Sequence, residues 1–221
     1  MKLSIIIPVY NEEKTLEEVV FRVQEVFNEE DYEIIIVNDG STDNTRRVIE
    51  NLDQPLVVIH HKKNYGKGKA IQSGLIPARG EYITIQDADL EYDPKNLYDL
   101  WIEAKPLSVV YGKRSNEKGY RLARLGNKIL SFVCNTLFSS KLSDIYTCYK
   151  VIPADVMKTL NLESDGFEIE AEITAKLLKR KVKILEIPIA YTPRTYREGK
   201  HIRWVDGLKG IWTLLRVKIR N

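Results

Sequence analysis

Four short apolar runs in the first half of the chain are separated by stretches with helical spacing, and this alternation constrains the fold most. The runs are Leu3–Ile7, Ile34–Val37, Leu56–Ile59 and Tyr82–Gln86. Continuous apolar runs of this length are typical of strands buried on both faces. Between the first two, apolar residues recur at three- and four-residue spacing from Leu16 to Phe27, which predicts a helix. The alternation predicts an α/β fold, with a parallel sheet covered by helices on both faces.

Polar residues that can accept hydrogen bonds from free backbone N–H groups predict where the helices begin. Asn11 is the expected N-cap of the first helix, and Ser41 or Thr42 that of the second. A further helix is expected over Lys69–Ile76, before the fourth strand. The first half therefore reads as four strands in regular alternation with helices.

The second half has a less regular pattern. Expected helices cover 97–103, 122–138 and 167–178, and expected strands cover 108–111 and 182–187. The polar, Arg-rich stretch Tyr191–Lys200 is expected to be a loop that meets an anionic partner. Because no linker-like tract interrupts the chain, we expect one domain over residues 1–201 and a basic amphipathic segment over 202–221.

The composition is that of an ordinary folded protein. The 221 residues are 43% hydrophobic and 29% charged, and the net charge of +3 is too small to indicate a nucleic-acid partner. Cys134 and Cys148 lack the spacing of a metal site, so we interpret them as small apolar residues in a reducing compartment, the cytoplasm by default. No signal-peptide pattern and no apolar run near the roughly 20 residues that span a bilayer occur, so we expect no membrane-spanning segment.

Three carboxylates follow the fourth apolar run. Asp87, Asp89 and Glu91 alternate along the chain, so their side chains share one face if the backbone stays extended. They lie beyond the carboxyl end of a strand, where open α/β sheets bind ligands. Converging carboxylates repel one another, and oxygen ligands suit Mg²⁺ or Mn²⁺, which proteins hold with one or two carboxylates and substrate phosphates. The alternative is an acidic turn before Pro94 that only ends a strand.

Several motifs, taken in order, resemble those of one enzyme family. They are IIIPVYNEE, IVNDGSTDNT, QDADLEYDP, VVYGKRS, LSDIYTCYKVIP, DGFEIEAEI, VKILEIPIAYTPR and REGKHIRWVDGLKG. Together they resemble the family 2 inverting glycosyltransferases with the GT-A fold, and within it the polyprenyl-phosphate glycosyltransferases typified by dolichol-phosphate mannose synthase. The resemblance implies a Rossmann-like sheet, a nucleotide diphospho-sugar donor such as GDP-mannose or a UDP-sugar, and a dolichyl or undecaprenyl phosphate acceptor.

The resemblance also assigns roles to residues near the strand ends. Those implied to bind the donor are Pro8, Val9, Tyr10, Glu12, Val37, Asp39, Asp87, Ala88, Asp89 and Arg114. Within this set Asp87, Asp89 and Arg114 are the expected catalytic residues, and Asp87, Asp89 and Glu91 are the expected metal ligands. The segment Asn64–Lys69 offers glycines for close backbone approach and lysines for phosphate, with a solvated turn as an equal alternative.

An anionic acceptor requires cations close to the donor diphosphate. The basic residues expected to contact the acceptor phosphate are Arg121, Arg124, Arg194 and Lys200. A phosphate monoester is already mostly dianionic near neutral pH, so it needs no base, and Asp144 is expected to be structural. One alternative is an enzyme of the same fold that glycosylates a saccharide or protein hydroxyl with Asp144 as base. Another is a non-catalytic nucleotide-sugar-binding module, which Asn38 favours because many relatives carry Asp there.

The stretch 202–221 mixes aromatic, aliphatic and basic residues. Trp beside Lys and Arg on an amphipathic helix is typical of a membrane interface, and a helix docked on the core is an equal alternative. A polyprenyl chain stays in the bilayer because each exposed CH₂ group costs about 0.8 kcal/mol. We therefore expect a peripheral protein at the cytoplasmic face of the membrane.

Overall fold

The computed structural model of the chain describes residues 2–28, 30–52, 56–104, 108–114, 121–194 and 204–220, with side chains except those of 121–123 and 204. In the first half the elements are β1 (Leu3–Val9), α1 (Leu16–Phe27), β2 (Tyr32–Asn38), α2 (Thr45–Glu50), β3 (Val57–His60), α3 (Lys67–Leu75) and β4 (Tyr82–Ile85). The second half contains α4 (Pro94–Glu103), β5 (Val109–Arg114), α5 (Arg121–Phe138), β6 (Lys150–Pro153), α6 (Ala154–Thr159), α7 (Ile169–Lys179), β7 (Ile184–Ile189) and α8 (Trp204–Ile219).

The strands form one seven-stranded sheet in the order β3-β2-β1-β4-β6-β5-β7. β6 runs antiparallel to both of its neighbours, and the other paired strands are parallel. β1 pairs with β2 on one side and β4 on the other, so the chain order reverses at β1. Ligand crevices in open α/β sheets form at such a reversal. The predicted α/β fold with a predominantly parallel sheet is confirmed.

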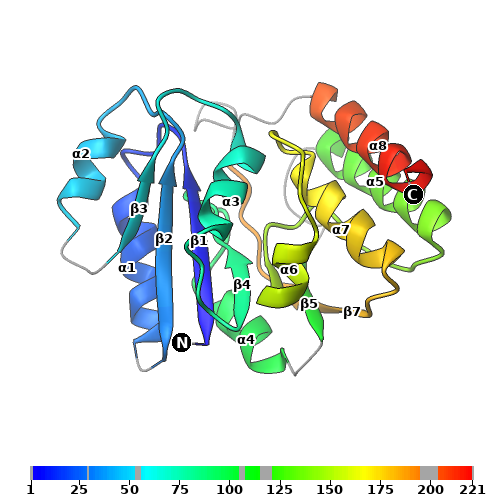
Figure 1. The fold of residues 1–221 in the computed structure, drawn as a ribbon, viewed down its shortest axis with the longest axis horizontal. Coiled ribbons are helices and arrows are strands. Elements are labelled where there is room, and N and C mark those ends of the chain that lie inside the picture. The colour runs from blue at the N-terminus through cyan, green and yellow to red at the C-terminus, as the bar shows by residue number, and fades with distance from the viewer. Residues whose placement is uncertain are drawn as a thin grey trace.

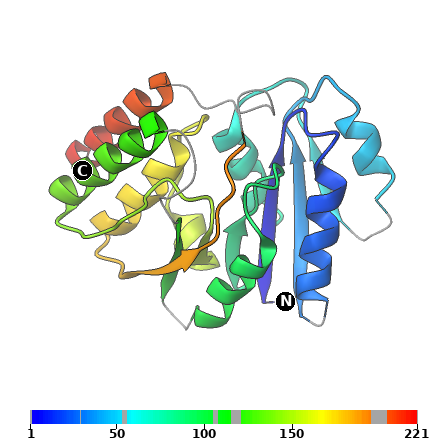
Figure 2. The same cartoon turned by 180° about the vertical axis from the view of Figure 1, so that it is seen from behind.

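Helices cover both faces of the sheet. α3 and α6 lie on the face turned towards the viewer in Figure 1, and α1 and α4 lie on the opposite face, seen in Figure 2. The main core lies between these layers, and its centre is made of fully buried side chains from β1 and β2, such as Ile6 and Ile36. Burying β1 and β2 on both faces explains why their sequences are almost continuously apolar.

A second apolar cluster lies among α5, α7 and α8, away from the main core. Its buried members include Leu130 and Cys134 from α5, Ala175 from α7 and Leu214 from α8. The three helices form a layer at the end of the molecule that holds the C-terminus (Figure 1). One face of the C-terminal helix therefore docks on the protein, which was one of the two alternatives for this segment. The predicted boundary at residue 201 lies outside the described residues.

The predicted helix starts were wrong in the first half. Asn11 has a left-handed backbone (φ 55°), and α1 begins only at Leu16. Asn11 Oδ1 instead accepts a hydrogen bond from Thr42 N at 2.8 Å, and the Asn11 N–H donates to Ser41 Oγ at 3.0 Å. These polar residues join the loops after β1 and β2 to each other, while α2 starts at Thr45. Side-chain hydrogen bonds to a neighbouring loop replaced the capping bonds that the sequence predicts.

In the described parts of the chain, no helix is both long enough and apolar enough to span a bilayer.

Candidate active site

A cavity of about 360 Å³ opens where the carboxyl ends of β1, β2 and β4 meet. Of the residues assigned in advance to donor, metal and acceptor, eleven line it: Pro8, Val9, Tyr10, Glu12, Asp39, Asp87, Ala88, Asp89, Glu91, Arg114 and Arg194. These residues are far apart in the chain and come together because parallel strands end at the same edge of the sheet.

Val37 does not belong to this set. Its side chain is fully buried in β2 and faces α3, where a Cβ built on Gly74 would lie 3.3 Å from Val37 Cγ2. The side chain of Val37 packs in the core beneath α3, so the predicted contact of Val37 with a nucleotide stays a prediction.

Asp39 fixes the loop that precedes α3. One carboxylate oxygen accepts from Tyr65 N at 3.0 Å and contacts His61 Nδ1 at 2.7 Å, and the other accepts from Gly66 N at 2.7 Å. His61 continues the network through Nε2 to Ser73 Oγ at 2.9 Å. The sequence did not indicate a role for His61. The structure makes it a support for Asp39 and thereby for the Asn64–Lys69 segment.

Two glycines allow this segment to touch the loop before α7. A Cβ at Gly66 would lie 2.3 Å from the carbonyl oxygen of Asp165, and one at Gly68 would lie 2.1 Å from that of Ser164. Gly66 also has φ of 102°, which a residue with a side chain rarely adopts. The close approach brings Lys67, at the start of α3, next to Glu170 on α7.

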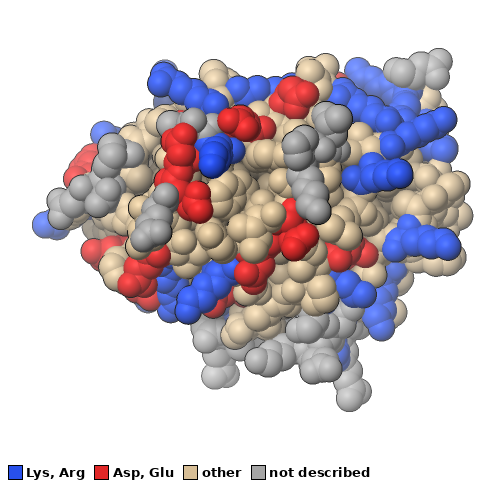
Figure 3. Space-filling model, turned by 90° about the horizontal axis from the view of Figure 1, so that it is seen from below, with Lys and Arg blue, Asp and Glu red and all other residues tan. Residues whose placement is uncertain are grey.

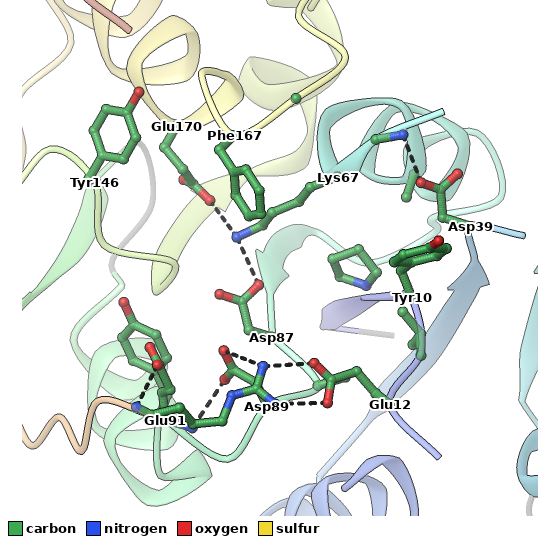
Figure 4. Close-up of a pocket in the computed structure, with 18 of the residues that line it drawn as sticks. Tyr10, Glu12, Asp39, Lys67, Asp87, Asp89, Glu91, Tyr146, Phe167 and Glu170 are labelled. Atoms are coloured by element: carbon green, nitrogen blue, oxygen red, sulfur yellow. Dashed lines mark hydrogen bonds and ion pairs between the residues drawn. The ribbon is translucent and has the colours of Figure 1, made fainter. Parts of the chain in front are cut away.

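Lys67 is the cation of the Asp87 side of the site. Its Nζ lies 2.8 Å from Asp87 Oδ1 and 3.1 Å from Glu170 Oε1, and Figure 4 shows it between the two carboxylates. Burial alone would lower the pKa of this ammonium, but Asp87 and Glu170 outweigh it and raise the pKa well above its ordinary value. Lys67 is therefore charged at any physiological pH.

Arg194 is the cation of the Asp89 side. Its guanidinium makes two hydrogen bonds to the Glu12 carboxylate, at 2.7 and 3.0 Å, and lies 3.4 Å from Asp89 Oδ2 (dashed lines in Figure 4). Burial, followed by repulsion from Asp87 and Glu91, raises the pKa of Asp89 to about 7, against the opposing effect of Arg194. A further cation beside Asp87 and Asp89 would relieve the part of this rise that repulsion causes.

Glu91 holds the segment that follows β7. Its two carboxylate oxygens accept hydrogen bonds from Tyr191 Oη at 2.5 Å and from Arg194 N at 2.7 Å. The backbone turns at Ala88 and Asp89, and Leu90 has φ of 59°, so the extended chain that would align three carboxylates is absent here. In this structure Glu91 anchors the segment after β7, and its role as a third metal ligand stays a prediction.

Arg114 and Asp144 form a buried ion pair at the edge of the cavity. Arg114 Nε lies 2.7 Å from Asp144 Oδ2 and Nη2 lies 2.8 Å from Oδ1, and the guanidinium stacks on the Tyr191 ring at 5.0 Å. Asn127 Nδ2 adds a hydrogen bond to the Asp144 carboxylate at 3.0 Å. Burial alone would raise the pKa of Asp144, but Arg114 and these hydrogen bonds hold it below its ordinary value. Asp144 therefore behaves as an anchoring carboxylate and a poor base.

Of the basic residues predicted to contact the acceptor phosphate, the structure describes the side chains of only Arg124 and Arg194. Arg194 lines the cavity, whereas Arg124 lies on α5 and is absent from the described lining. The side chain of Arg121 and the whole of Lys200 lie outside the described residues.

Some lining residues were missed by the sequence reasoning. They are Ala70, Tyr92, Tyr146, Gly166, Phe167 and Glu170, whereas Tyr191 begins the loop that was expected to meet an anionic partner. Glu170 left a usable signal, because it occurs with Glu172 within a helix whose neighbouring positions are buried and apolar. Buried carboxylates need cationic or hydrogen-bonding partners, so this pattern indicates a polar site beneath the helix.

The described residues contain no group of three or more His, Cys, Asp or Glu side chains arranged to hold a metal ion. Asp87 and Asp89 nevertheless fit a divalent ion of the Mg²⁺ type. Both line the cavity, both are partly exposed, and repulsion between them contributes to the raised pKa of Asp89. Such ions commonly use one or two carboxylates and complete their coordination with water and substrate phosphates.

Sequence comparisons identify the family. The family model described as Glycosyl transferase family 2 matches residues 4–160, so the chain belongs to this family. It is 31% identical over 210 residues to an undecaprenyl-phosphate 4-deoxy-4-formamido-L-arabinose transferase of Pseudomonas fluorescens (strain Pf0-1), covering 90% of this chain and 60% of that protein. A dodecaprenyl-phosphate galacturonate synthase of Rhizobium johnstonii is 30% identical over 171 residues, covering 73% and 51%. The chain thus spans between half and two thirds of these relatives.

Solved structures agree on the fold. Glucosyl-3-phosphoglycerate synthase from Mycobacterium tuberculosis, in complex with Mn²⁺, UDP and glucosyl-3-phosphoglycerate, superposes with a TM-score of 0.75 at 19% identity, covering 98% of this chain and 79% of that one. The same protein in complex with Mg²⁺ and UDP also has a TM-score of 0.75 at 19% identity, with the same coverage of both chains. At this identity the likeness concerns the fold alone, which is the GT-A fold.

Proposed function

We propose that this chain transfers a sugar from a nucleotide diphospho-sugar to a polyprenyl phosphate, with inversion at the anomeric carbon and dependence on a divalent metal ion. Two relatives whose names specify polyprenyl-phosphate sugar transfer support the substrate class. The observation that carries the proposal is that each carboxylate of the Asp87–Asp89 pair contacts its own side-chain cation, Lys67 or Arg194.

This arrangement allows an exchange of partners when substrates bind. A bound Mg²⁺ or Mn²⁺ would neutralise the charge that develops on the departing diphosphate. With that positive charge on Asp87 and Asp89, Lys67 and Arg194 become available to phosphate oxygens. Lys67 is the nearer to the loop held by Asp39, so we assign it to the donor diphosphate. Arg194 can present a planar fork to the acceptor phosphate.

The reaction then needs no proton transfer to a side chain. A phosphate oxygen of the acceptor forms the new bond to the anomeric carbon, and the bond from that carbon to the diphosphate oxygen breaks, with its electrons leaving on the nucleoside diphosphate. The nucleophile is already ionised near neutral pH, since the second pKa of a phosphate monoester is about 6. The residues of the site position the two anions and compensate their charge.

The alternative with a hydroxyl acceptor is less well supported by the geometry. It needs a base that reaches the acceptor, and the candidate Asp144 is 2% exposed, bound to Arg114 on both oxygens and not among the described lining residues. For the non-catalytic alternative, Asn38 is engaged within its own loop, where Oδ1 accepts from Ser41 N at 3.0 Å. That loop contact gives a structural reason for Asn at this position that does not depend on catalysis.

Because the acceptor is a lipid, we also place the protein peripherally at the cytoplasmic face of a membrane. The first test is a screen of nucleotide sugars for thermal stabilisation that requires Mg²⁺ or Mn²⁺, since a ligand bound by the native state raises stability by mass action. The stabilising donor is then incubated with polyprenyl phosphate and, separately, with the free polyprenol. Donor consumption with the phosphate alone supports the proposal, and consumption with the polyprenol alone contradicts it.

A further inference from the structure

A second cavity, of about 470 Å³, lies between the ends of α7 and α8 and the segment that follows α6. None of its described lining residues belongs to the described lining of the candidate active site. Its volume lies within the roughly 300–1,000 Å³ that is typical of small-molecule sites. The chain therefore has room for a ligand at a place separate from the candidate active site.

The described lining of this second cavity has a net positive charge, and we name it the basic cavity. Its basic side chains are Lys176, Lys179, Arg180, Arg216 and Arg220, and its acidic side chains are Glu163 and Glu172. The described lining of the candidate active site has the opposite balance, with three basic and six acidic side chains. Figure 3 shows Lys and Arg gathered over the end of the molecule that carries α7 and α8, with Asp and Glu mostly elsewhere. Without a metal ion, an anion is therefore expected to prefer the basic cavity.

Glu172 is the buried carboxylate of the basic cavity, and its charge is already compensated. It accepts hydrogen bonds from Ser164 N at 2.7 Å and Glu163 N at 3.0 Å, and Lys176 Nζ lies 2.6 Å from its Oε1. Burial alone would raise the pKa of Glu172, but Lys176 and Ser164 hold it below its ordinary value. Glu172 therefore does not need the other cations of the cavity.

Arg216 lines the basic cavity without a short contact to either carboxylate. Its Nη1 lies 3.8 Å from Glu163 Oε2 and its Nη2 lies 3.9 Å from Glu172 Oε1, whereas charge-assisted hydrogen bonds are about 2.7–2.9 Å long. Glu163 is instead held by Arg220, at 2.6 Å. The side chain of Arg216 is 34% exposed, and a guanidinium has five N–H donors. Arg216 is thus placed to donate hydrogen bonds to a ligand.

Lys179 and Arg180 contact neutral oxygens. Lys179 Nζ donates to the carbonyl oxygens of Val217, at 3.0 Å, and of Arg220. Arg180 donates from Nη1 to Thr159 Oγ1 at 2.8 Å and from Nη2 to the Thr159 carbonyl oxygen. Capping of helix ends explains where these two cations lie, because the last carbonyl groups of a helix lack intrahelical partners. It does not neutralise their charge, which adds to that of Arg216.

We propose that the basic cavity binds a small soluble anion that carries phosphate groups. Arg180 and Arg216 offer planar guanidinium groups that match phosphate oxygens, and Lys179 supplies a further positive charge. The excess of basic side chains favours a ligand with more than one negative charge, such as a diphosphate. A concave site of this volume suits a small anion better than an extended charged surface. The assignment does not depend on the proposed sugar transfer.

The test is isothermal titration calorimetry of the purified chain with sodium pyrophosphate in EDTA, so that no divalent ion can hold the probe at the candidate metal site. The parent chain should bind pyrophosphate saturably, with an affinity that falls as salt is added. Arg180→Gln with Arg216→Gln should weaken binding roughly tenfold or more, because charged hydrogen bonds are lost. The matched control is Arg22→Gln with Arg46→Gln, since each of these exposed arginines pairs with a Glu of its own helix.

Two single variants complete the comparison. Lys67→Gln should bind pyrophosphate as the parent does, because Lys67 lines the candidate active site and not the basic cavity. Arg220→Gln should weaken binding to a smaller extent than the double variant. The Arg220 side chain is 65% exposed, so this change is expected to leave the fold intact. Melting temperatures without pyrophosphate confirm that each variant is folded, and Arg220→Gln decides the outcome if the double variant does not fold.

No saturable binding by the parent, or unchanged affinity in the folded double variant, would overturn the proposal. Loss of binding in Lys67→Gln would overturn it as well, because the probe would then occupy the candidate active site. Vesicles of phosphatidylcholine with phosphatidic acid form a second arm of the experiment. Binding to these vesicles without binding of pyrophosphate would place the phosphate on a lipid and overturn the assignment to a soluble anion. Because the titration contains no metal and no donor, its result is independent of whether the proposed function holds.

Discussion

The Lys67 ammonium joins the Asp87 carboxylate, 2.8 Å away, to α7, where it also contacts Glu170. Glu170 in turn pairs with the buried Lys150 of β6, so the acidic segment after β4 is connected to the second half of the sheet. In this network of ion pairs, each buried charged group has an oppositely charged partner, and each would be unfavourable without it. It also places a cation beside Asp87 in the lining of the cavity.

Replacing Lys67 with Gln tests this cation. We expect kcat/KM for the donor to fall by about 10²–10³, the usual effect of losing one preorganised group that stabilises developing negative charge. Lys69→Gln is the matched control, since Lys69 is two residues away and its exposed side chain contacts Gln72. Steady-state kinetics with varied donor and a melting curve for each variant separate catalysis from folding. Equal losses in both variants would remove the assignment of Lys67.

Asp89→Asn tests the metal assignment. The change keeps the shape of the side chain and removes its charge, so the protein should stay folded while activity falls by orders of magnitude. Metal-dependent stabilisation by the donor should disappear with it. Asp99→Asn on α4 is the control, because Asp99 is exposed and outside the cavity lining. Full activity of the parent chain in EDTA would contradict the prediction.

Arg194→Lys and Arg194→Ala test the role of a planar guanidinium. Arg194 makes two hydrogen bonds to Glu12 and approaches Asp89, so lysine should restore only part of the activity that alanine removes. The Michaelis constant for polyprenyl phosphate should rise more than that for the donor. Arg22→Ala on α1 controls for loss of a surface arginine. A rise in the Michaelis constant for the donor alone would instead indicate that Arg194 binds the donor.

The Arg114–Asp144 pair should contribute mainly to stability. Arg114→Ala leaves a buried carboxylate without its partner, which typically destabilises by about 3–5 kcal/mol. Because the folded-state pKa of Asp144 is lowered, its stabilising effect is present above the unfolded-state pKa of about 3.9 and is lost as the pH falls below it. The difference in unfolding free energy between the parent and Asp144→Asn, measured with urea, should therefore be constant from pH 7 to 5 and shrink below pH 4. A difference that already shrinks between pH 7 and 5 would contradict the lowered pKa.

The same Asp144→Asn variant distinguishes the two acceptor chemistries. If the acceptor is a phosphate monoester, the acidic limb of the pH–rate profile near pH 6 belongs to the acceptor and should remain. If Asp144 is a base for a hydroxyl acceptor, the change should lower the rate of sugar transfer by about 10²–10⁴-fold and abolish the acidic limb of the pH–rate profile. The comparison uses saturating metal and a temperature at which the variant is fully folded.

Much of the first half was predictable because its strands are buried on both faces. β1, β2 and β4 occur where the apolar runs are, and the carboxylates after β4 do reach the ligand crevice. β6 was missed because it is short, antiparallel and begins with Lys150, a buried lysine whose compensating Glu170 is distant in the chain. Local sequence does not reveal such long-range pairing.

The same limitation explains the parts of the site that were missed. Asp87 and Asp89 were found because they follow a strong strand signal. The glycines and lysines of Asn64–Lys69 indicated close backbone approach and phosphate binding, but not that Gly66 and Gly68 let α3 approach the loop before α7 or that Lys67 contacts Asp87. The three carboxylates would share one face only on an extended backbone, and the sequence does not show that the chain turns before Glu91.

The most direct test of the central claim is the identity of the product. The folded chain is incubated with Mg²⁺ or Mn²⁺, the stabilising nucleotide sugar, and polyprenyl phosphate in competition with the corresponding polyprenol. Mass spectrometry and NMR then determine which acceptor carries the sugar and with which anomeric configuration. The account predicts a polyprenyl phosphate sugar whose anomeric configuration is inverted relative to the donor. Sugar on the free polyprenol alone, a retained configuration, or no transfer by a chain that binds the donor would contradict it.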